Sequence, residues 1–97
     1  IAKDEDPDRM TVAATNVDFP APLNDIPDHV AFNKYIGWYS KSVYDFGPWL
    51  ASQMSARNGR SMAMGEYGAG ASIDQHQANP PRPVADGPWH PEEYQNL

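Results

Sequence analysis

The stretch Arg60-Ser61-Met62-Ala63-Met64-Gly65-Glu66 is a short apolar run that ends on a carboxylate. Asn58-Gly59 precedes it, and a turn of small residues, Gly68-Ala69-Gly70-Ala71, follows it closely. An apolar run of this length between turn signals is typical of a buried strand. We predict a strand over 60–66, and because side chains alternate along a strand, Met62, Met64 and Glu66 are expected on one face.

Two further strands are predicted upstream of this stretch. Met10 to Thr15 is mostly apolar with β-branched residues, and we expect it to be a buried strand. His29 to Tyr35 is the second, and its alternation puts Asn33 and Tyr35 on one face. Between these two strands, three prolines leave room for one helical turn at most, near residues 23–26.

A helix is predicted from about Phe46 to Arg57, between the second and third strands. Pro48 suits its first turn, and Gly59 suits the left-handed position after its end. Its expected buried stripe is Phe46, Leu50 and Met54, joined by Trp49. The order strand, strand, helix, strand predicts an α/β fold with a parallel sheet. From Ser72 to Pro88 we expect a long irregular loop, and from Trp89 the start of another helix.

Composition excludes several functional classes. The 97 residues carry a formal net charge of −6 with only seven Lys and Arg, which argues against a nucleic-acid partner. There is no cysteine, so disulfide scaffolds and thiolate metal sites are excluded. No apolar run approaches membrane-spanning length, so no membrane partner is predicted. Neither end reads like a natural terminus, and the compartment is left open.

Glu66 is the first candidate for chemistry. A carboxylate at the carboxyl end of a parallel strand lies where barrel enzymes assemble their sites, although a solvated glutamate beside a tight turn is the simpler alternative. Asn33 and Tyr35 end the preceding strand, and a tyrosine hydroxyl can hydrogen-bond a carboxylate and hold it ionised. Each of the two can equally be structural, with Tyr35 filling the sheet interior and Asn33 satisfying loop backbone.

Aromatic and histidine side chains extend the candidate set. Trp38 and Trp89 occur in predicted loops on the face of Glu66, where flat rings can wall a sugar site or anchor the loops. His76 could hydrogen-bond near the Glu66 turn. Neither His76 nor His90 has a second ligand at metal spacing, so the chain predicts no metal site.

Three motifs together resemble glycoside hydrolase family 2. They are Phe-Asn-Lys-Tyr-Ile-Gly-Trp-Tyr from residue 32, Gly-Glu-Tyr-Gly-Ala-Gly-Ala-Ser-Ile-Asp-Gln-His from residue 65, and Trp-His-Pro-Glu-Glu-Tyr-Gln from residue 89. The stretch Asp-Pro-Asp-Arg-Met-Thr-Val-Ala-Ala-Thr, from residue 6, is similar to the family's fifth barrel strand. The resemblance implies that residues 1–97 are part of a (β/α)8 TIM barrel, about strands 5 to 7, truncated at both ends.

The resemblance also implies roles for residues. Glu66 would be the catalytic nucleophile, and Tyr35 would hydrogen-bond and orient it. Asn33 and Trp38 would line the same pocket, and we add His76 and Trp89, from their positions in the sequence, as further candidates for binding substrate. The family's acid/base glutamate would lie before Ile1, and the eighth strand would follow Leu97. No cofactor is expected on these residues, and a metal elsewhere in the full enzyme is left open.

The activity implied is that of a retaining exo-β-glycosidase that removes terminal β-D-galactose through a covalent glycosyl-enzyme. Its partners would be the β-galactoside and the remainder of the barrel, and residues 1–97 alone are expected to be inactive. One alternative is a β-glucuronidase of the same family. Another is a non-catalytic carbohydrate-binding or interaction piece, which the absence of an Asn-Glu pair upstream of Ile1 would favour.

Overall fold

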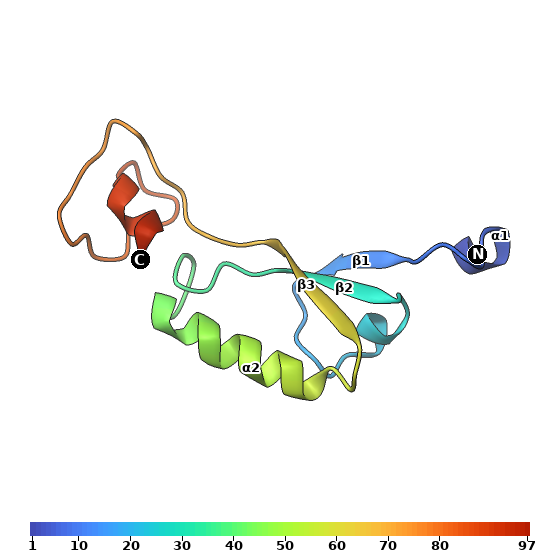
Figure 1. Ribbon diagram of the computed structural model, residues 1–97. Helices are drawn as coiled ribbons and strands as arrows, with labels where there is room; N and C mark the ends of the chain where they lie inside the picture. The colour runs from blue at the N-terminus through green and yellow to red at the C-terminus, as the bar shows by residue number, and fades with distance from the viewer. The chain divides into compact units, whose positions relative to one another are not determined.

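The structure is a computed structural model that describes residues 1–97, and the chain forms two compact units (Figure 1). The first unit contains Ile1–Lys34 and Leu50–Glu66, and the second contains Tyr35–Trp49 and Tyr67–Leu97. Neither unit is continuous in sequence. Each strand of the chain lies in the first unit, and the long loop lies in the second.

A three-stranded parallel sheet organises the first unit (Figure 1). Its strands are β1 (Val12–Thr15), β2 (His29–Asn33) and β3 (Ser61–Glu66), in the order β1-β2-β3. This confirms the predicted parallel sheet of an α/β fold. The prediction that the second strand continues to Tyr35 is wrong, because β2 ends at Asn33.

The core of the first unit forms around the central strand. Val30 and Phe32, two residues apart on β2, are 1% and 0% exposed. The ring of Phe19 meets that of Phe32 edge to face, with centroids 5.6 Å apart. This arrangement suits the quadrupoles of the two rings and covers the face of β2 that carries Val30 and Phe32.

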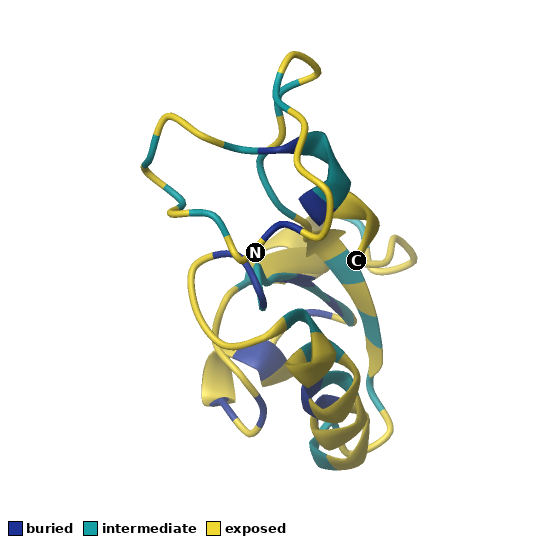
Figure 2. Cartoon of the chain, turned by 90° about the vertical axis from the view of Figure 1, so that its left-hand side faces the viewer, coloured by how far each residue is buried: buried dark blue, intermediate teal, exposed yellow.

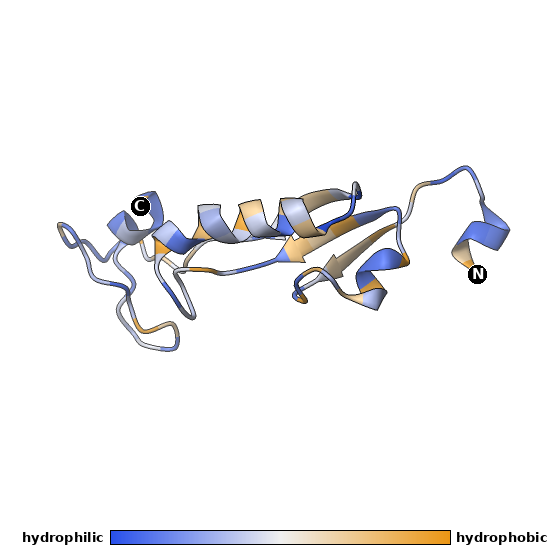
Figure 3. Ribbon diagram, turned by 90° about the horizontal axis from the view of Figure 1, so that it is seen from below, coloured by the Kyte–Doolittle hydropathy of each residue, from blue (hydrophilic) through white to orange (hydrophobic).

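Strand β1 corrects one prediction. The sequence predicts a buried strand from Met10, but β1 begins at Val12 and three of its four residues are exposed. Val12 itself is 67% exposed. The physical reason is position: β1 is an edge strand with no neighbour on its outer side, so the apolar character typical of a buried parallel strand is not buried here. Figure 3 shows apolar colouring along the strands.

Helix α2 (Phe46–Ala56) follows the predicted bounds within one residue. A 3-10 turn, Val43–Asp45, precedes it and is capped by Ser42, whose side chain accepts from the Tyr44 N–H. Gly59 has φ of +80°, as predicted for the residue that follows the helix.

The buried side of α2 differs from the predicted stripe. Trp49 is buried as predicted, at 7% exposed, but Gln53 is also buried, at 4%, and Met54 is 52% exposed. Figure 2 shows that much of the chain, the long helix included, is coloured as exposed. Gln53 is buried because its side-chain oxygen accepts a 2.7 Å hydrogen bond from the Phe19 N–H. An amide with a buried partner can replace an apolar residue, and apolar periodicity does not detect it.

The beginnings of β1 and β2 are joined by a polar cluster. The Asp28 carboxylate accepts from the Thr11 N–H at 2.7 Å and from its hydroxyl at 2.9 Å. Lys3 adds an ion pair at 2.9 Å. The backbone bond from Thr11, followed by the Lys3 and Thr11 side-chain bonds, holds the pKa of Asp28 well below its usual range.

The remaining elements are short. They are α1 (Ala2–Glu5) and 3-10 turns at Pro22–Asp25 and Glu92–Asn96. The predicted loop is confirmed, because no helix or strand lies between Glu66 and Glu92. The predicted last helix is a 3-10 turn. None of the helices has the length and apolar character needed to cross a membrane.

Candidate functional site

Glu66 is the last residue of β3, at the carboxyl edge of the parallel sheet. The register changes just before it: Phe32 pairs with Met64, but the next residue of β2, Asn33, pairs with Glu66. The extra residue on β3 is Gly65. Because paired residues on neighbouring strands share a face, this irregularity moves Glu66 to the face of Asn33. The predicted common face for Met62, Met64 and Glu66 is therefore wrong at its last member.

Asn33 depends on a glycine at position 65. A Cβ atom on Gly65 would lie 2.6 Å from the Asn33 side-chain oxygen and 3.4 Å from the Ala31 Cβ. The first distance is far inside van der Waals contact. The missing side chain of Gly65 thus makes the space that is occupied by the amide of Asn33, the residue that pairs with Glu66.

Lys34, directly after β2, contacts the end of β3 and the segment that follows β1. Its backbone N–H donates to the Glu66 carbonyl at 2.9 Å. Its ammonium pairs with Asp18, in the segment after β1, at 2.8 Å, and also donates to the Asn16 carbonyl. The Lys34 side chain is 21% exposed and that of Asp18 is 46% exposed, so solvent screens this pair from the Asp18 side. The backbone around Glu66 is therefore fixed from its β2 side.

Tyr35 lies outside β2 and belongs to the second unit. The strand alternation that predicted a common face for Asn33 and Tyr35 stops at Asn33. The Tyr35 carbonyl accepts from the N–H groups of Trp38 and Tyr39, and the Tyr35 ring packs on that of Tyr39 at 5.6 Å. Tyr35 therefore begins a turn rather than ending a strand.

Trp38 is a buried member of an aromatic cluster in the second unit. It is 7% exposed, and its ring meets those of His90 at 4.9 Å and Tyr94 at 6.5 Å. A Cβ on Gly70 would lie 3.0 Å from the Trp38 ring, so the predicted small-residue turn allows the close approach of this indole.

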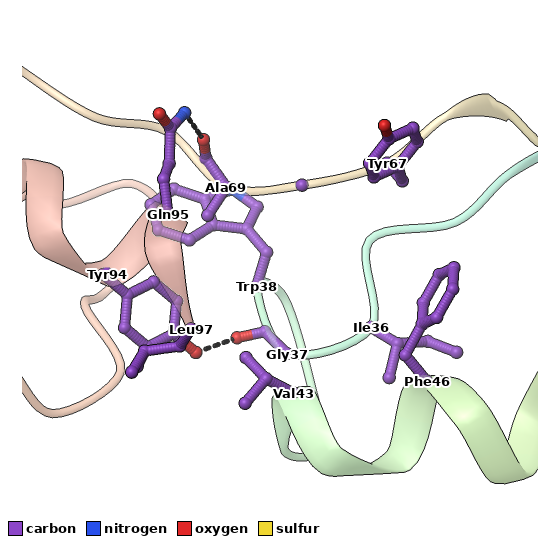
Figure 4. Close-up of a pocket in the computed structure, with 11 residues that line it drawn as sticks. Ile36, Gly37, Trp38, Val43, Phe46, Tyr67, Ala69, Tyr94, Gln95 and Leu97 are labelled. Carbon is purple, nitrogen blue, oxygen red and sulfur yellow. Dashed lines mark hydrogen bonds between the residues drawn. The ribbon is translucent and has the colours of Figure 1, made fainter.

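An apolar cavity of about 290 Å³ lies beside this cluster (Figure 4). Trp38, Tyr67 and Tyr94 contribute aromatic walls. The Tyr94 hydroxyl donates to the Gly37 carbonyl and Gln95 donates to the Ala69 carbonyl (Figure 4). These two bonds fix the last 3-10 turn of the chain to the two loops that form the cavity.

His76 and Trp89 come together in the long loop. The His76 Nδ1 lies 3.0 Å from a Glu93 oxygen, and the second oxygen accepts from the Gln77 N–H at 3.0 Å. The Trp89 indole N–H donates to the Gln77 side chain at 3.2 Å. The hydrogen bond to Glu93 raises the pKa of His76, and the bond from Gln77 lowers that of Glu93.

The predicted site residues belong to both units. Glu66 and Asn33 are neighbours in the first unit, while Tyr35, Trp38, His76 and Trp89 belong to the second. No group of three or more His, Cys, Asp or Glu side chains is arranged to hold a metal ion.

Lys34 and Glu93 are residues that sequence reasoning missed. Glu93 lies 17 positions from its partner His76, so local pattern does not connect the two residues. Lys34 directly follows the predicted site residue Asn33. Its charge next to the predicted site was the available signal, but pairing with Asp18 could not be read from local pattern.

Comparison with known proteins shows homology over nearly the whole chain. A β-glucuronidase of Bacteroides fragilis is 39% identical over 95 residues, which is 98% of this chain and 13% of that protein. A crystal structure from Bacteroides fragilis, described as that of a candidate β-galactosidase, matches with a TM-score of 0.84 and 32% identity over 98% of this chain and 14% of that one.

A third relative is β-glucuronidase 2 of Bacteroides uniformis, described as covalently bound to cyclophellitol-6-carboxylate aziridine. It matches with a TM-score of 0.75 and 31% identity over 96% of this chain and 11% of that one. No protein-family model matches the chain. The shares of the three relatives that the chain covers, 11 to 14%, show that it spans only a small part of the length of the proteins that it matches.

Proposed function

Because this chain is a fragment of a glycoside hydrolase family 2-like protein, we propose that its parent enzyme is a retaining exo-β-glycosidase with Glu66 as the nucleophile. The observation that carries the proposal is the register change at Gly65, which brings Glu66 and Asn33 to one face at the carboxyl edge of the sheet. An amide beside a carboxylate at this edge suits a site that both binds sugar hydroxyls and attacks the anomeric carbon.

The retaining mechanism requires two carboxyl groups roughly 5–5.5 Å apart, one to attack and one to protonate the leaving oxygen. Glu66 would form the glycosyl-enzyme bond, and a second glutamate outside these residues would act as acid and then as base. Support comes from the Bacteroides uniformis relative, which is described as covalently bound to an aziridine. An aziridine is an electrophile, so covalent attachment implies a nucleophile in that protein.

We also propose that the sheet is part of a (β/α)8 barrel, as about its fifth to seventh strands. Support comes from the parallel order β1-β2-β3, in which strands consecutive in sequence are neighbours, and from α2 as the crossover between β2 and β3. In this proposal, Tyr35 orients the nucleophile, and Asn33, Trp38, His76 and Trp89 bind the carbohydrate. A parent enzyme with the Tyr35→Phe substitution is then expected to lose kcat, by less than a nucleophile variant.

The decisive test is Glu66→Gln in the intact parent enzyme. The amide is nearly isosteric but cannot attack, so turnover should fall on the order of 10³-fold or more. Thermal unfolding should be unchanged, and Glu5→Gln, an exposed carboxylate in α1, should leave turnover unchanged as the matched control. A 2-deoxy-2-fluoro glycoside should attach to Glu66, as read by peptide mass spectrometry. Label on another carboxylate, or turnover near the wild-type rate, would refute the assignment.

Two sugars are candidates for the substrate. The Glu66 motif favours terminal β-D-galactose, and one structural relative is described as a candidate β-galactosidase. The 39% identical relative is a β-glucuronidase, which favours β-D-glucuronate as the second candidate. The two sugars differ in the configuration at C4 and in the group on C5, which in glucuronate is a carboxylate that needs a cationic partner. The ratio of kcat/KM for p-nitrophenyl β-D-galactoside and p-nitrophenyl β-D-glucuronide discriminates between them.

A further inference from the structure

A second cavity in the second unit, of about 310 Å³, is distinct in its charge from the apolar one. Lys41, Ser42 and Tyr44 line it from the segment before α2, and Arg82 lines it from the long loop. Tyr94 closes it. Its volume is at the lower end of the range in which proteins bind small molecules or single sugar units.

Unpaired positive charge is concentrated at this cavity. Four of the seven basic side chains, namely Lys3, Arg9, Lys34 and Arg60, form ion pairs with aspartates. Lys41 and Arg82 form none, yet both line the same cavity, which no carboxylate side chain lines. In a chain of net charge −6, this is a local excess of cations that have no anionic partner.

The backbone of Lys41 connects the two segments that carry the cations. Lys41 has φ of +63°, a left-handed conformation that is uncommon for a residue with a side chain. Its carbonyl accepts a 3.0 Å hydrogen bond from an Arg82 guanidinium nitrogen, which joins segments 41 positions apart. A guanidinium has five N–H donors, so most remain for a ligand. Asp45, the acid nearest to Lys41 in sequence, accepts a 2.9 Å hydrogen bond from the Ser42 N–H.

Aromatic rings complete the cavity. Tyr44 is 81% exposed, whereas Tyr94 is 5% exposed and its hydroxyl donates to the Gly37 carbonyl. An exposed ring next to a forked cation offers an apolar surface for sugar C–H groups together with donors for an anion. Neither a hydrophobic ligand nor a neutral sugar would supply a negative charge to pair with the two cations.

We propose that this cavity binds an anionic sugar unit, a carboxylate or sulfate ester, of a longer glycan. Arg82 forms a bidentate contact with the anion, Lys41 adds a second charge, and the Tyr44 ring packs on the sugar. The proposal rests on the proposed glycosidase function for its glycan, but binding at this cavity is measurable without turnover. The cavity thereby selects glycans by a unit other than the one that is cleaved.

The test is calorimetric titration of the intact parent protein at low salt with three probes of equal length. They are an oligogalacturonate, which carries carboxylates only, a sulfated dextran oligosaccharide, which carries sulfates only, and a neutral dextran oligosaccharide. We expect one or both anionic probes to bind and the neutral probe not to bind. Lys41→Gln and Arg82→Gln should each weaken the anionic probe about 10-fold, since each removes a charge-assisted contact.

Control variants distinguish binding at this cavity from binding at the catalytic site and from the effect of net charge on binding. Arg9→Gln removes the same charge from an 82% exposed arginine in the first unit and should leave binding unchanged. Lys41→Arg and Arg82→Lys keep the charge and should retain most of the binding. The kcat/KM for a small neutral aryl glycoside should change less than twofold in all of these variants.

Equal binding of an anionic probe to wild type and to both glutamine variants overturns the proposal, as does equal binding of the neutral probe or no binding of any probe. Absence of glycosidase activity with the charge-dependent binding intact would instead refute the proposed enzyme function and leave this site standing. The two failures are therefore distinguishable.

Discussion

At the level of single residues, His76 of the long loop forms a charged contact with Glu93 of the last 3-10 turn, at 3.0 Å. Glu93 uses both oxygens, one for the imidazole and one for the Gln77 N–H, each at 3.0 Å. The Glu92 carboxylate lies 3.9 Å from the same imidazole nitrogen, so its attraction for the imidazole is weaker than that of Glu93. Charge-assisted bonds of this kind order a loop that has no regular secondary structure.

This contact should make the order of the loop depend on pH. The pKa of His76 is raised, so its contribution is complete below pH 6.5 and is lost as pH rises through the raised value. The pKa of Glu93 is lowered, so its contribution is complete above pH 4.5 and is lost as pH falls through the lowered value. Hydrogen exchange of the Gln77 amide in the parent protein, corrected for its intrinsic rate, should show greatest protection between these limits.

His76→Gln is the control for the upper limit. It removes the titrating group, so protection of the Gln77 amide should no longer decline as pH rises above 6.5. An unchanged decline in this variant would assign the pH dependence to another group.

At the level of elements, the register change between β2 and β3 decides where the candidate nucleophile lies. A regular ladder would pair Asn33 with Gly65 and leave Glu66 on the face of Met64. The single extra residue reverses this. Such a bulge re-aims one side chain without altering the rest of the sheet.

Gly65→Ala tests the contact that accompanies this register. The new methyl would lie 2.6 Å from the Asn33 side-chain oxygen, so we expect the parent protein to lose about 1–3 kcal/mol of unfolding free energy and much of its activity. Denaturant unfolding and kcat measure the two effects. Gly47→Ala is the matched control, because nothing lies within 4 Å of its Cβ position and alanine favours a helix.

A double variant sharpens this test. Asn33→Ala removes the clashing oxygen and leaves the Ala31 Cβ at 3.4 Å as the nearest neighbour of the new methyl. Gly65→Ala should therefore cost less stability in the Asn33→Ala background than in wild type. Strict additivity of the two substitutions would show that the contact is not the cause.

At the level of the whole molecule, the 97 residues leave much apolar surface uncovered. Val12, Leu23 and Ile26 in the first unit are 67%, 74% and 77% exposed. The outer edges of β1 and β3 have no strand partner. Neither feature suits a stable isolated domain.

A peptide of residues 1–97 is therefore expected to show no cooperative thermal transition by circular dichroism and no hydrolysis of aryl glycosides. The parent protein under the same conditions should unfold with a sharp transition. A cooperative transition of the peptide alone would show that the exposed surface is tolerated.

The three strands, the helix and the parallel order were predictable from the amino-acid sequence, because they follow from short-range signals. Apolar runs mark β2 and β3, and Gly59 marks the end of α2. Family motifs also singled out Glu66. Those signals could not give the face on which Glu66 lies, because one inserted residue in a ladder reverses a face and leaves no trace in local periodicity.

Contacts between residues that are distant in sequence depend on the tertiary structure and could not be predicted from the sequence. Gln53 is buried because the Phe19 N–H reaches it across 34 positions, and Lys41 and Arg82 share a cavity although 41 positions separate them. The exposure of β1 likewise depends on which strands flank it. In each case the free energy depends on a partner remote in sequence, so composition and spacing specify the elements, and packing specifies which side chains meet.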